Sequence, residues 1–213
     1  MSVEALAAPV ALHRPLPPEE AARGDFYALL ARLLRDAPDG ALLASLAAAG
    51  PIPSDGDAAL SKAWQDLVYA ASAMDADAAA EEYENLFVGM GKSEVSLYAG
   101  FYGGAPSIDH PRVRLQADLA GLGLERRPEV TEPEDHYAGL FEVMRVLVAG
   151  GAGRSPAPLA EQKRFYGTHL EPGVARCFAA MGSAPHANFY RHVAAVGRAF
   201  TAIESVSFQL ESR

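Results

Sequence analysis

The stretch Phe26–Leu34 reads FYALLARLL and decides the fold class. Its large aliphatic and phenylalanine side chains fall at positions i, i+3, i+4, i+7 and i+8, which are Phe26, Leu29, Leu30, Leu33 and Leu34. This spacing places them in one stripe along an α-helix. We expect that helix to run from about Pro18 to Asp36 and to be stopped by Pro38.

The same helical periodicity recurs along the rest of the chain. Alanine occurs 42 times, while Val, Ile and Thr together occur 20 times, a composition that favours helix over strand. Asp57 is expected to cap one helix and Gly89 to close another. Further helices are expected over 41–49, after Asp57, over 75–87, 111–122, 137–148, 158–169 and 172–181, and from Phe189 to Ile203. The sequence therefore predicts an all-α protein, a single globular domain of about eight to ten helices.

Three segments depart from this helical pattern. Residues 1–17 are expected to form a flexible N-terminal tail ahead of one helical domain over 18–213, and the Gly- and Pro-rich residues 150–158 to form a hinge. Residues 89–106 mix five glycines with Tyr98, Phe101 and Tyr102, which is typical of a binding loop. Thr131 and Glu134 have the spacing of a capping box for the helix that follows them.

Charge and composition exclude several classes of protein. The formal charge is −9, which repels a phosphate backbone and disfavours a nucleic-acid partner. The sequence shows neither a secretory signal nor an apolar run of membrane-spanning length, so membrane insertion is not expected. Its single cysteine forbids an intramolecular disulfide and agrees with a reducing cytoplasm.

Motifs for catalysis, phosphate or metal binding are missing from the sequence. Gly91-Lys92-Ser93 lacks the earlier glycine of a phosphate loop, because Leu86 stands in its place. None of the six histidines pairs with another at i, i+4, and no Glu-x-x-His triplet occurs. Cys177 lies in an apolar helical stretch, which favours a buried core residue over a reactive thiol. We therefore expect no metal, no cofactor and no enzymatic activity.

Two segments combine polar and aromatic residues unusually densely. One is Glu82–Phe87 with the later Ser96–Tyr98, and the other is Glu132–His136. Structural roles account for each segment taken alone, with Leu86 and Phe87 in the core and Asp135 at a helix start. An ionised Asp135 in that position is also suited to accept a hydrogen bond from a guanidinium.

In combination, these segments resemble the TorD/DmsD/NarJ family of cytoplasmic redox-enzyme chaperones. The likeness rests on three elements in order, Tyr83-x-x-Leu86-Phe87, then Ser96-x-Tyr98, then Glu132-Pro133-x-Asp135-His136. It extends to the Arg23–Arg32 stretch, to Gln162–Pro172 and to Phe189–Glu204. The sequence departs from many relatives in having no proline between Gly91 and Ser96.

The resemblance implies an all-α protein that binds the N-terminal, twin-arginine-type signal segment of a molybdenum-cofactor oxidoreductase. Such a protein holds the apo form of the catalytic subunit in the cytoplasm until cofactor insertion is complete. Carried over position by position, the peptide-binding residues are Tyr83, Leu86, Phe87, Ser96, Tyr98, Asp135 and His136. A monomer or a domain-swapped dimer is compatible with the resemblance.

A twin-arginine segment presents two guanidiniums followed by apolar residues, so its groove needs carboxylates and apolar walls. Asp135, with Glu132 and Glu134, is predicted to supply the carboxylates; the walls are predicted to be Leu86, Phe87, Tyr98, Phe101 and Tyr102. We therefore expect the two segments to converge. Two alternatives are a permanent structural subunit of a redox complex and a small-molecule enzyme using His136 and Asp135. Adjacent helical residues point about 100° apart, which disfavours such a dyad.

Overall fold

The computed structural model describes residues 15–52, 57–89, 93–103, 111–125, 132–151 and 153–210. These residues form ten α-helices and one π-helical turn, with no strand among them, which confirms the predicted all-α domain. The α-helices are α1 Pro18–Arg35, α2 Gly40–Ala47, α3 Ala58–Ala73, α4 Ala76–Tyr83, α5 Ala99–Tyr102, α6 Pro111–Gly121, α7 Tyr137–Ala149, α8 Leu159–His169, α9 Val174–Ser183 and α10 Phe189–Leu210. The π-helical turn, η1, covers Glu84–Val88 and directly continues α4.

Aspartates begin three of the helices. The side chains of Asp39, Asp57 and Asp75 accept hydrogen bonds from backbone N–H groups in the first turns of α2, α3 and α4. Such N-caps satisfy amides that have no partner inside the helix. The prediction for Asp57 is confirmed.

The predicted capping box ahead of α7 is wrong. The N-cap of α7 is His136, whose Nδ1 accepts a hydrogen bond of 3.2 Å from the backbone N–H of Ala138. Glu134 therefore precedes the helix instead of occupying its third position, and Thr131 lies outside the described residues. A ring nitrogen replaces the hydroxyl oxygen that the sequence pattern suggested.

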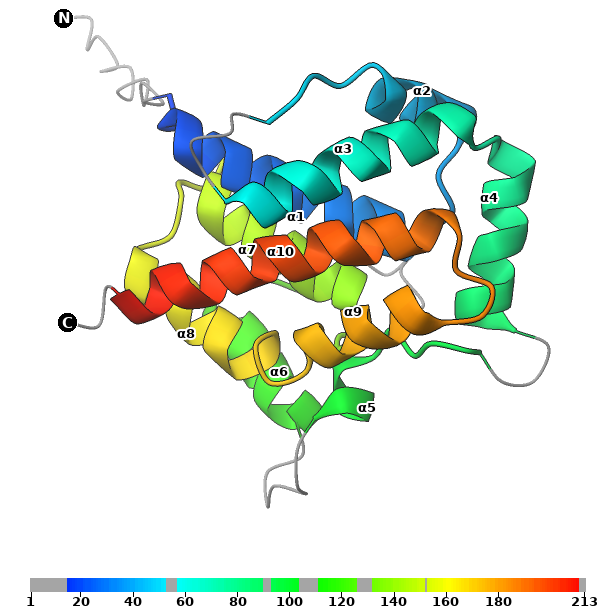
Figure 1. Ribbon diagram of the computed structural model, residues 1–213. Helices are drawn as coiled ribbons and strands as arrows, with labels where there is room; N and C mark the ends of the chain where they lie inside the picture. Colours follow the sequence, from blue (N-terminus) through cyan, green and yellow to red (C-terminus); the bar gives the residue numbers. More distant parts are fainter. Residues whose placement is uncertain are drawn as a thin grey trace, which may run out of the picture.

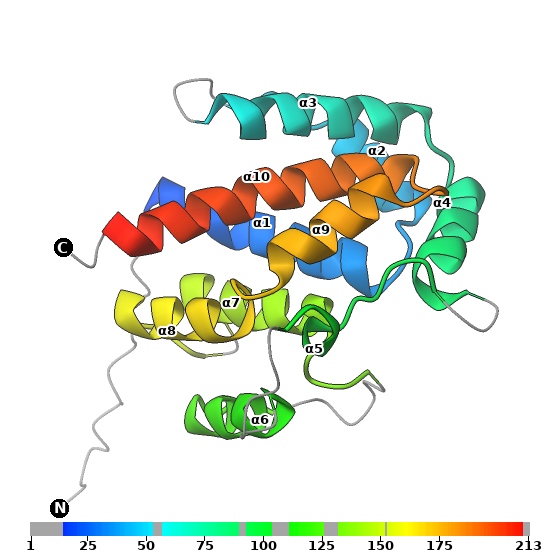
Figure 2. The same cartoon turned by 60° about the horizontal axis from the view of Figure 1, so that its bottom comes forward.

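Helix α1 lies in the middle of the molecule and packs most extensively against α7 (Figure 1). Gly24 permits this close approach, because a Cβ atom at that position would lie 3.0 Å from the Cβ of Ala149. Helix α10 packs against α9 and α3. Turned by 60°, the molecule shows α3 above α10 and α1, with α7 and α8 beneath them and α6 beyond (Figure 2).

A buried carboxylate ties α1 to α10. Glu204 is 1% exposed and accepts hydrogen bonds from both Nε and one Nη of Arg23, at 2.8 Å each, and from the hydroxyl of Tyr27 at 2.6 Å. A charge-assisted network of this kind satisfies a carboxylate that has left water. Arg23, Tyr27 and Glu204 all belong to the stretches that carried the family resemblance, and the structure gives them a common role in stability.

The α9–α10 contact depends on a missing side chain. A Cβ atom at Gly197 would lie 2.3 Å from the ring of Phe178, so only glycine admits this ring. Cys177, next to Phe178, is 1% exposed, and burial raises the pKa of its thiol to about 12. The prediction that Cys177 is a core residue is confirmed.

The predicted break after α7 contains a tight turn. Gly151 and Arg154 exchange two backbone hydrogen bonds of 3.0 Å, and Gly150 has a φ of +72°. Residue 152 lies outside the described residues, as do residues 1–14 of the predicted tail. The tail and the hinge stay predictions. Among the described helices, none is long and apolar enough to span a membrane.

Candidate functional site

The two segments singled out in the sequence meet through their backbones. Tyr98 and His136 form an isolated antiparallel bridge. On either side of this pair lie two backbone hydrogen bonds of 2.8 Å, from Ala99 N–H to the carbonyl of Asp135 and from Tyr137 N–H to the carbonyl of Leu97. The rings of Tyr98 and His136 pack edge to face, with centroids 5.2 Å apart. The predicted convergence is therefore confirmed, and we call this arrangement the bridge site, residues 96–101 and 132–137.

The carboxylate of Asp135 lies at the centre of the bridge site. Its Oδ1 accepts a hydrogen bond of 2.9 Å from Nε of Arg112 in α6, and its Oδ2 accepts one of 3.3 Å from the backbone N–H of Gly100. A Cβ atom at position 100 would lie 3.0 Å from Oδ2, so the glycine leaves room for the carboxylate. The sequence suggested that this carboxylate suits a guanidinium, and the chain itself supplies one.

The hydrogen bond that the His136 ring accepts favours its neutral form. Its Nδ1 accepts the N–H of Ala138, which places any ring proton of the neutral form on Nε2. Burial lowers the pKa of His136, although the nearby carboxylates of Glu132 and Asp135 act in the opposite direction. The ring thus serves as a helix cap and as a packing surface for Tyr98.

A second group of aromatic rings packs at the C-terminal end of α1. Tyr83 and Phe87 pack edge to face at 5.0 Å, and both contact the ring of Tyr190. The hydroxyl of Tyr83 donates to the carbonyl of Arg35 at 2.8 Å, and the hydroxyl of Tyr190 donates to that of Leu33 at 3.0 Å. These hydroxyls satisfy carbonyls that have no partner at the end of a helix. We call these three rings the aromatic cluster.

The aromatic cluster and the bridge site lie close together and interact electrostatically and through the backbone. Burial raises the pKa of Tyr83 well above its ordinary value, and Glu132 and Tyr98 of the bridge site raise it further. A backbone hydrogen bond of 2.9 Å from the N–H of Val95 to the carbonyl of Leu86 also joins residues 93–98 to η1. Together these contacts form one continuous region from the end of α1 to the start of α7.

The seven residues predicted from sequence are thus gathered in one region, but they differ in exposure. Leu86 is fully buried and presents no surface to a ligand in this structure. Asp135 and His136 are buried, whereas Tyr83, Phe87, Ser96 and Tyr98 are half-buried. Phe101, which follows Gly100 in α5, is 72% exposed. Tyr102, predicted to line the groove, is buried.

Sequence reasoning missed Arg112 and Gly100, which both contact Asp135. A signal for Arg112 existed, because a cation in the first turn of a helix is unfavourable unless it has a partner. The sequence analysis named Glu82 as part of a candidate segment but did not foresee its role. Its buried carboxylate accepts hydrogen bonds from three successive backbone N–H groups at the start of α10.

The geometry of the bridge site favours binding over acid–base chemistry. Asp135 is directed at Arg112 and Gly100, while Nδ1 of His136 is directed at Ala138, so the two side chains serve different partners. Within the described ranges, no group of three or more His, Cys, Asp or Glu side chains is arranged to hold a metal ion.

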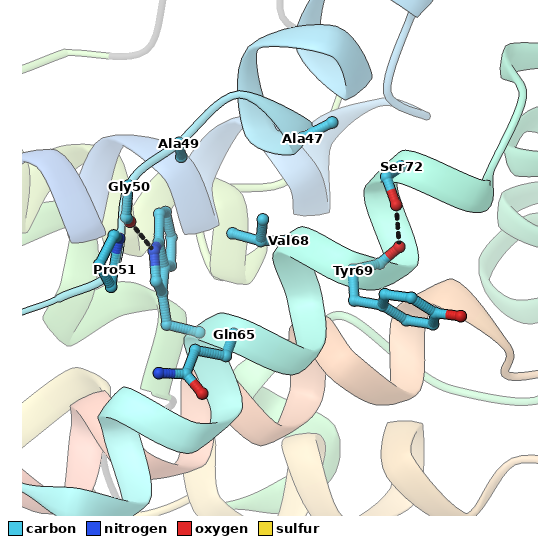
Figure 3. Close-up of a pocket in the computed structure, with 9 residues that line it drawn as sticks. Ala47, Ala49, Gly50, Pro51, Gln65, Val68, Tyr69 and Ser72 are labelled. Atoms are coloured by element: carbon cyan, nitrogen blue, oxygen red, sulfur yellow. Dashed lines mark hydrogen bonds between the residues drawn. The ribbon is translucent and has the colours of Figure 1, made fainter.

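Two hollows lie away from the bridge site. One, of about 390 Å³, lies between α3 and the segment after α2, where Nε1 of Trp64 donates to the carbonyl of Gly50 at 2.9 Å (Figure 3). The other, of about 800 Å³, is lined largely by alanines of α3, α9 and α10. None of the seven predicted site residues lines either hollow.

A family model matches more than half of the chain. Residues 54–179 match the family model described as nitrate reductase delta subunit. This range covers more than half of the chain and contains all seven predicted site residues. No curated protein matches the sequence closely enough to count as a relative.

Proposed function

The chain belongs to the nitrate reductase delta subunit family, a family of molybdoenzyme maturation chaperones, and from this premise we propose that it binds the N-terminal, twin-arginine-type signal segment of a molybdenum-cofactor oxidoreductase. In this role it holds the apo form of the catalytic subunit in the cytoplasm. Release follows cofactor insertion and precedes export or assembly.

The observation that carries the proposal is the bridge between Tyr98 and His136. It brings the buried Asp135 to Ala99 and Gly100, which bond to it and which Tyr98 and the exposed Phe101 flank in the sequence. A carboxylate beside apolar and aromatic surface is the complement of a peptide that carries guanidiniums ahead of an apolar stretch.

The aromatic cluster extends the proposed surface. Tyr83, Phe87 and Ser96 are half-buried beside the bridge site, and Leu86 supports them from the core. Aromatic side chains give large contact area at low cost in conformational entropy. The net charge of −9 favours encounter with a basic leader over an acidic one.

Of the two alternatives, an enzyme using His136 and Asp135 receives no support from the different directions of these side chains. Co-purification distinguishes the other alternative, a permanent structural subunit, from a chaperone. The proposal expects the chain to accompany the cofactor-free catalytic subunit and to be missing from the mature enzyme.

A binding experiment tests the proposal at the residue level. A synthetic leader peptide with two consecutive arginines and an apolar segment is titrated into the full chain by calorimetry. Asp135→Asn is expected to weaken binding by roughly tenfold to a hundredfold, the effect of losing one charge-assisted hydrogen bond. Asp66→Asn, which changes a partly exposed carboxylate of α3 that is paired with Lys62, is the control. Equal affinity of all three proteins would contradict the proposal.

A further inference from the structure

Arg112 occupies the position that the proposed function assigns to a guanidinium of the client. Its Nε donates to Oδ1 of Asp135 at 2.9 Å, and this is an ion pair between α6 and the start of α7. Among the described residues, the partner of the second oxygen of Asp135 is the backbone N–H of Gly100, at the longer distance of 3.3 Å. Within this part of the chain, the guanidinium is therefore the principal partner of the carboxylate.

The two members of this ion pair differ in their exposure. The side chain of Asp135 is 8% exposed, whereas that of Arg112 is 46% exposed. A carboxylate this far from water needs a cationic or multiple hydrogen-bonding partner, because leaving it unpaired is costly. The half-exposed guanidinium, in contrast, recovers its hydration when it moves away. The buried carboxylate of Asp135 therefore needs a cationic partner, and another cation can take the place of Arg112.

Helix α6, which carries Arg112, is attached at the periphery of the molecule. Figure 2 shows it at the lower edge of the molecule, beyond α7 and α8. Besides the Arg112 ion pair, Asp118 bonds to Nε2 of His169 in α8 at 2.8 Å, and Arg154 donates to backbone carbonyls just after the helix. Leu115 and Leu122 are buried and anchor the helix in the core. The polar contacts act beside this apolar anchor and can be exchanged for others of the same chemistry while α6 stays attached.

We propose that Arg112 is an internal stand-in for an arginine of the client leader, and that the client displaces it from Asp135. This inference rests on the proposed function and specifies how the same site is used. In the free chaperone, Arg112 keeps the carboxylate paired. A leader with a guanidinium of its own replaces Arg112, whereas an apolar or acidic segment gains nothing by doing so. The exchange therefore selects leaders that carry arginine.

Calorimetric titration of the twin-arginine peptide into Arg112→Gln tests the exchange. Glutamine keeps a side-chain donor near Asp135 but removes the competing charge. The variant is expected to bind the peptide roughly tenfold to a hundredfold more tightly than the wild type, because a charge-assisted hydrogen bond no longer has to be broken first. Arg114→Gln, an equal change of charge at an exposed position of the same helix, is expected to bind like the wild type.

The outcomes separate this inference from the proposed function. If Asp135→Asn weakens binding while Arg112→Gln binds like the wild type or more weakly, the exchange is refuted and the proposed function stands. If no protein of the set binds the peptide, both are refuted. In the double variant Arg112→Gln/Asp135→Asn, the gain from removing Arg112 is expected to vanish. Thermal melting of each variant checks that the fold is retained.

The displacement of Arg112 from Asp135 can also be followed in the wild-type protein. Hydrogen exchange of the wild type is compared with and without the peptide. Backbone amides of α6 are expected to exchange faster in the complex, since the helix loses its ion pair to Asp135. Slower or unchanged exchange in α6 under saturating peptide would overturn the inference.

Discussion

The carboxylate of Glu82 accepts a hydrogen bond of 2.7 Å from the backbone nitrogen of Tyr190, although the two residues lie 108 positions apart. The same carboxylate accepts the N–H groups of Asn188 and Phe189 at 2.8 and 2.9 Å. Glu82 therefore caps α10 from the end of α4, where negative charge is favourable at a helix N-terminus. This cap also fixes Tyr190 against Tyr83 and Phe87, so the order of the aromatic cluster depends on it.

Replacing Glu82 by alanine is expected to destabilise the protein by about 2–3 kcal/mol, because buried N–H groups lose a charged acceptor. Chemical denaturation measures the change in the free energy of unfolding. Glu81→Ala removes an equal charge from an exposed neighbouring position and is expected to change stability by less than about 0.5 kcal/mol. Similar effects of the two substitutions would contradict the capping role.

Gly197→Ala is expected to destabilise the α9–α10 contact. The new methyl group would lie 2.3 Å from the ring of Phe178, and overpacking of this kind costs about 1–3 kcal/mol. Gly182→Ala places a methyl group at an ordinary 3.7 Å from Ala194 and is the matched control. Thermal melting is expected to show a lower midpoint for the first variant and an unchanged or higher one for the second. The opposite order would be inconsistent with the packing described here.

Gly100→Ala tests the space beside Asp135. Its Cβ would lie 3.0 Å from Oδ2, so the carboxylate must shift away from both Gly100 and Arg112. We expect weaker binding of the leader peptide, by roughly threefold to tenfold, from a misplaced charge-assisted hydrogen bond. In Gly103→Ala the new methyl group would meet the described atoms around it at an ordinary 3.6 Å or more, and the variant is expected to bind normally. Unaltered affinity of Gly100→Ala would show that the carboxylate position is unimportant.

The stability of the protein is expected to fall as the pH is lowered through about 6.5. Burial lowers the pKa of both His136 and His169, so the unfolded chain takes up protons at these rings before the folded chain does. Above the pKa that the two histidines have in the unfolded chain, the neutral rings contribute fully to the free energy of unfolding. This contribution is lost as the pH falls toward the lower pKa that they have in the folded chain.

His136→Asn isolates one of these rings, since asparagine also caps helices but does not titrate. Denaturation at pH 7.5 and pH 5.5 is expected to show a smaller loss of stability for the variant than for the wild type. An equal loss in both proteins would mean that His136 does not contribute to the pH dependence.

Local sequence patterns determined much of the fold. The stripe from Phe26 to Leu34 predicted α1, whose buried residues include Leu30, Leu33 and Leu34, and Asp57 caps α3 as expected. These features depend on residues within one or two turns of each other, and helical periodicity reports such neighbours directly.

Contacts between residues far apart in the chain could not be predicted from the sequence. Glu82 caps a helix more than 100 residues away, and Arg112 reaches Asp135 from another helix, so neither partner is visible in a local window. The last turn before Gly89 is π-helical instead of α-helical, a change that periodicity does not resolve. The convergence of the two segments was expected from the family resemblance and from the groove that a leader peptide needs, but the backbone pairing of Tyr98 with His136 that produces it was not.

A hydrogen-exchange footprint of the bound leader tests the central claim most directly. The full chain is measured by mass spectrometry with and without a saturating twin-arginine peptide, and with the same peptide carrying glutamines in place of the arginine pair. The account predicts slower exchange in residues 96–101 and 132–137 with the arginine peptide, and little change with the glutamine peptide. Protection confined to the alanine-lined hollow of α3, α9 and α10, or none in the bridge site, would contradict it.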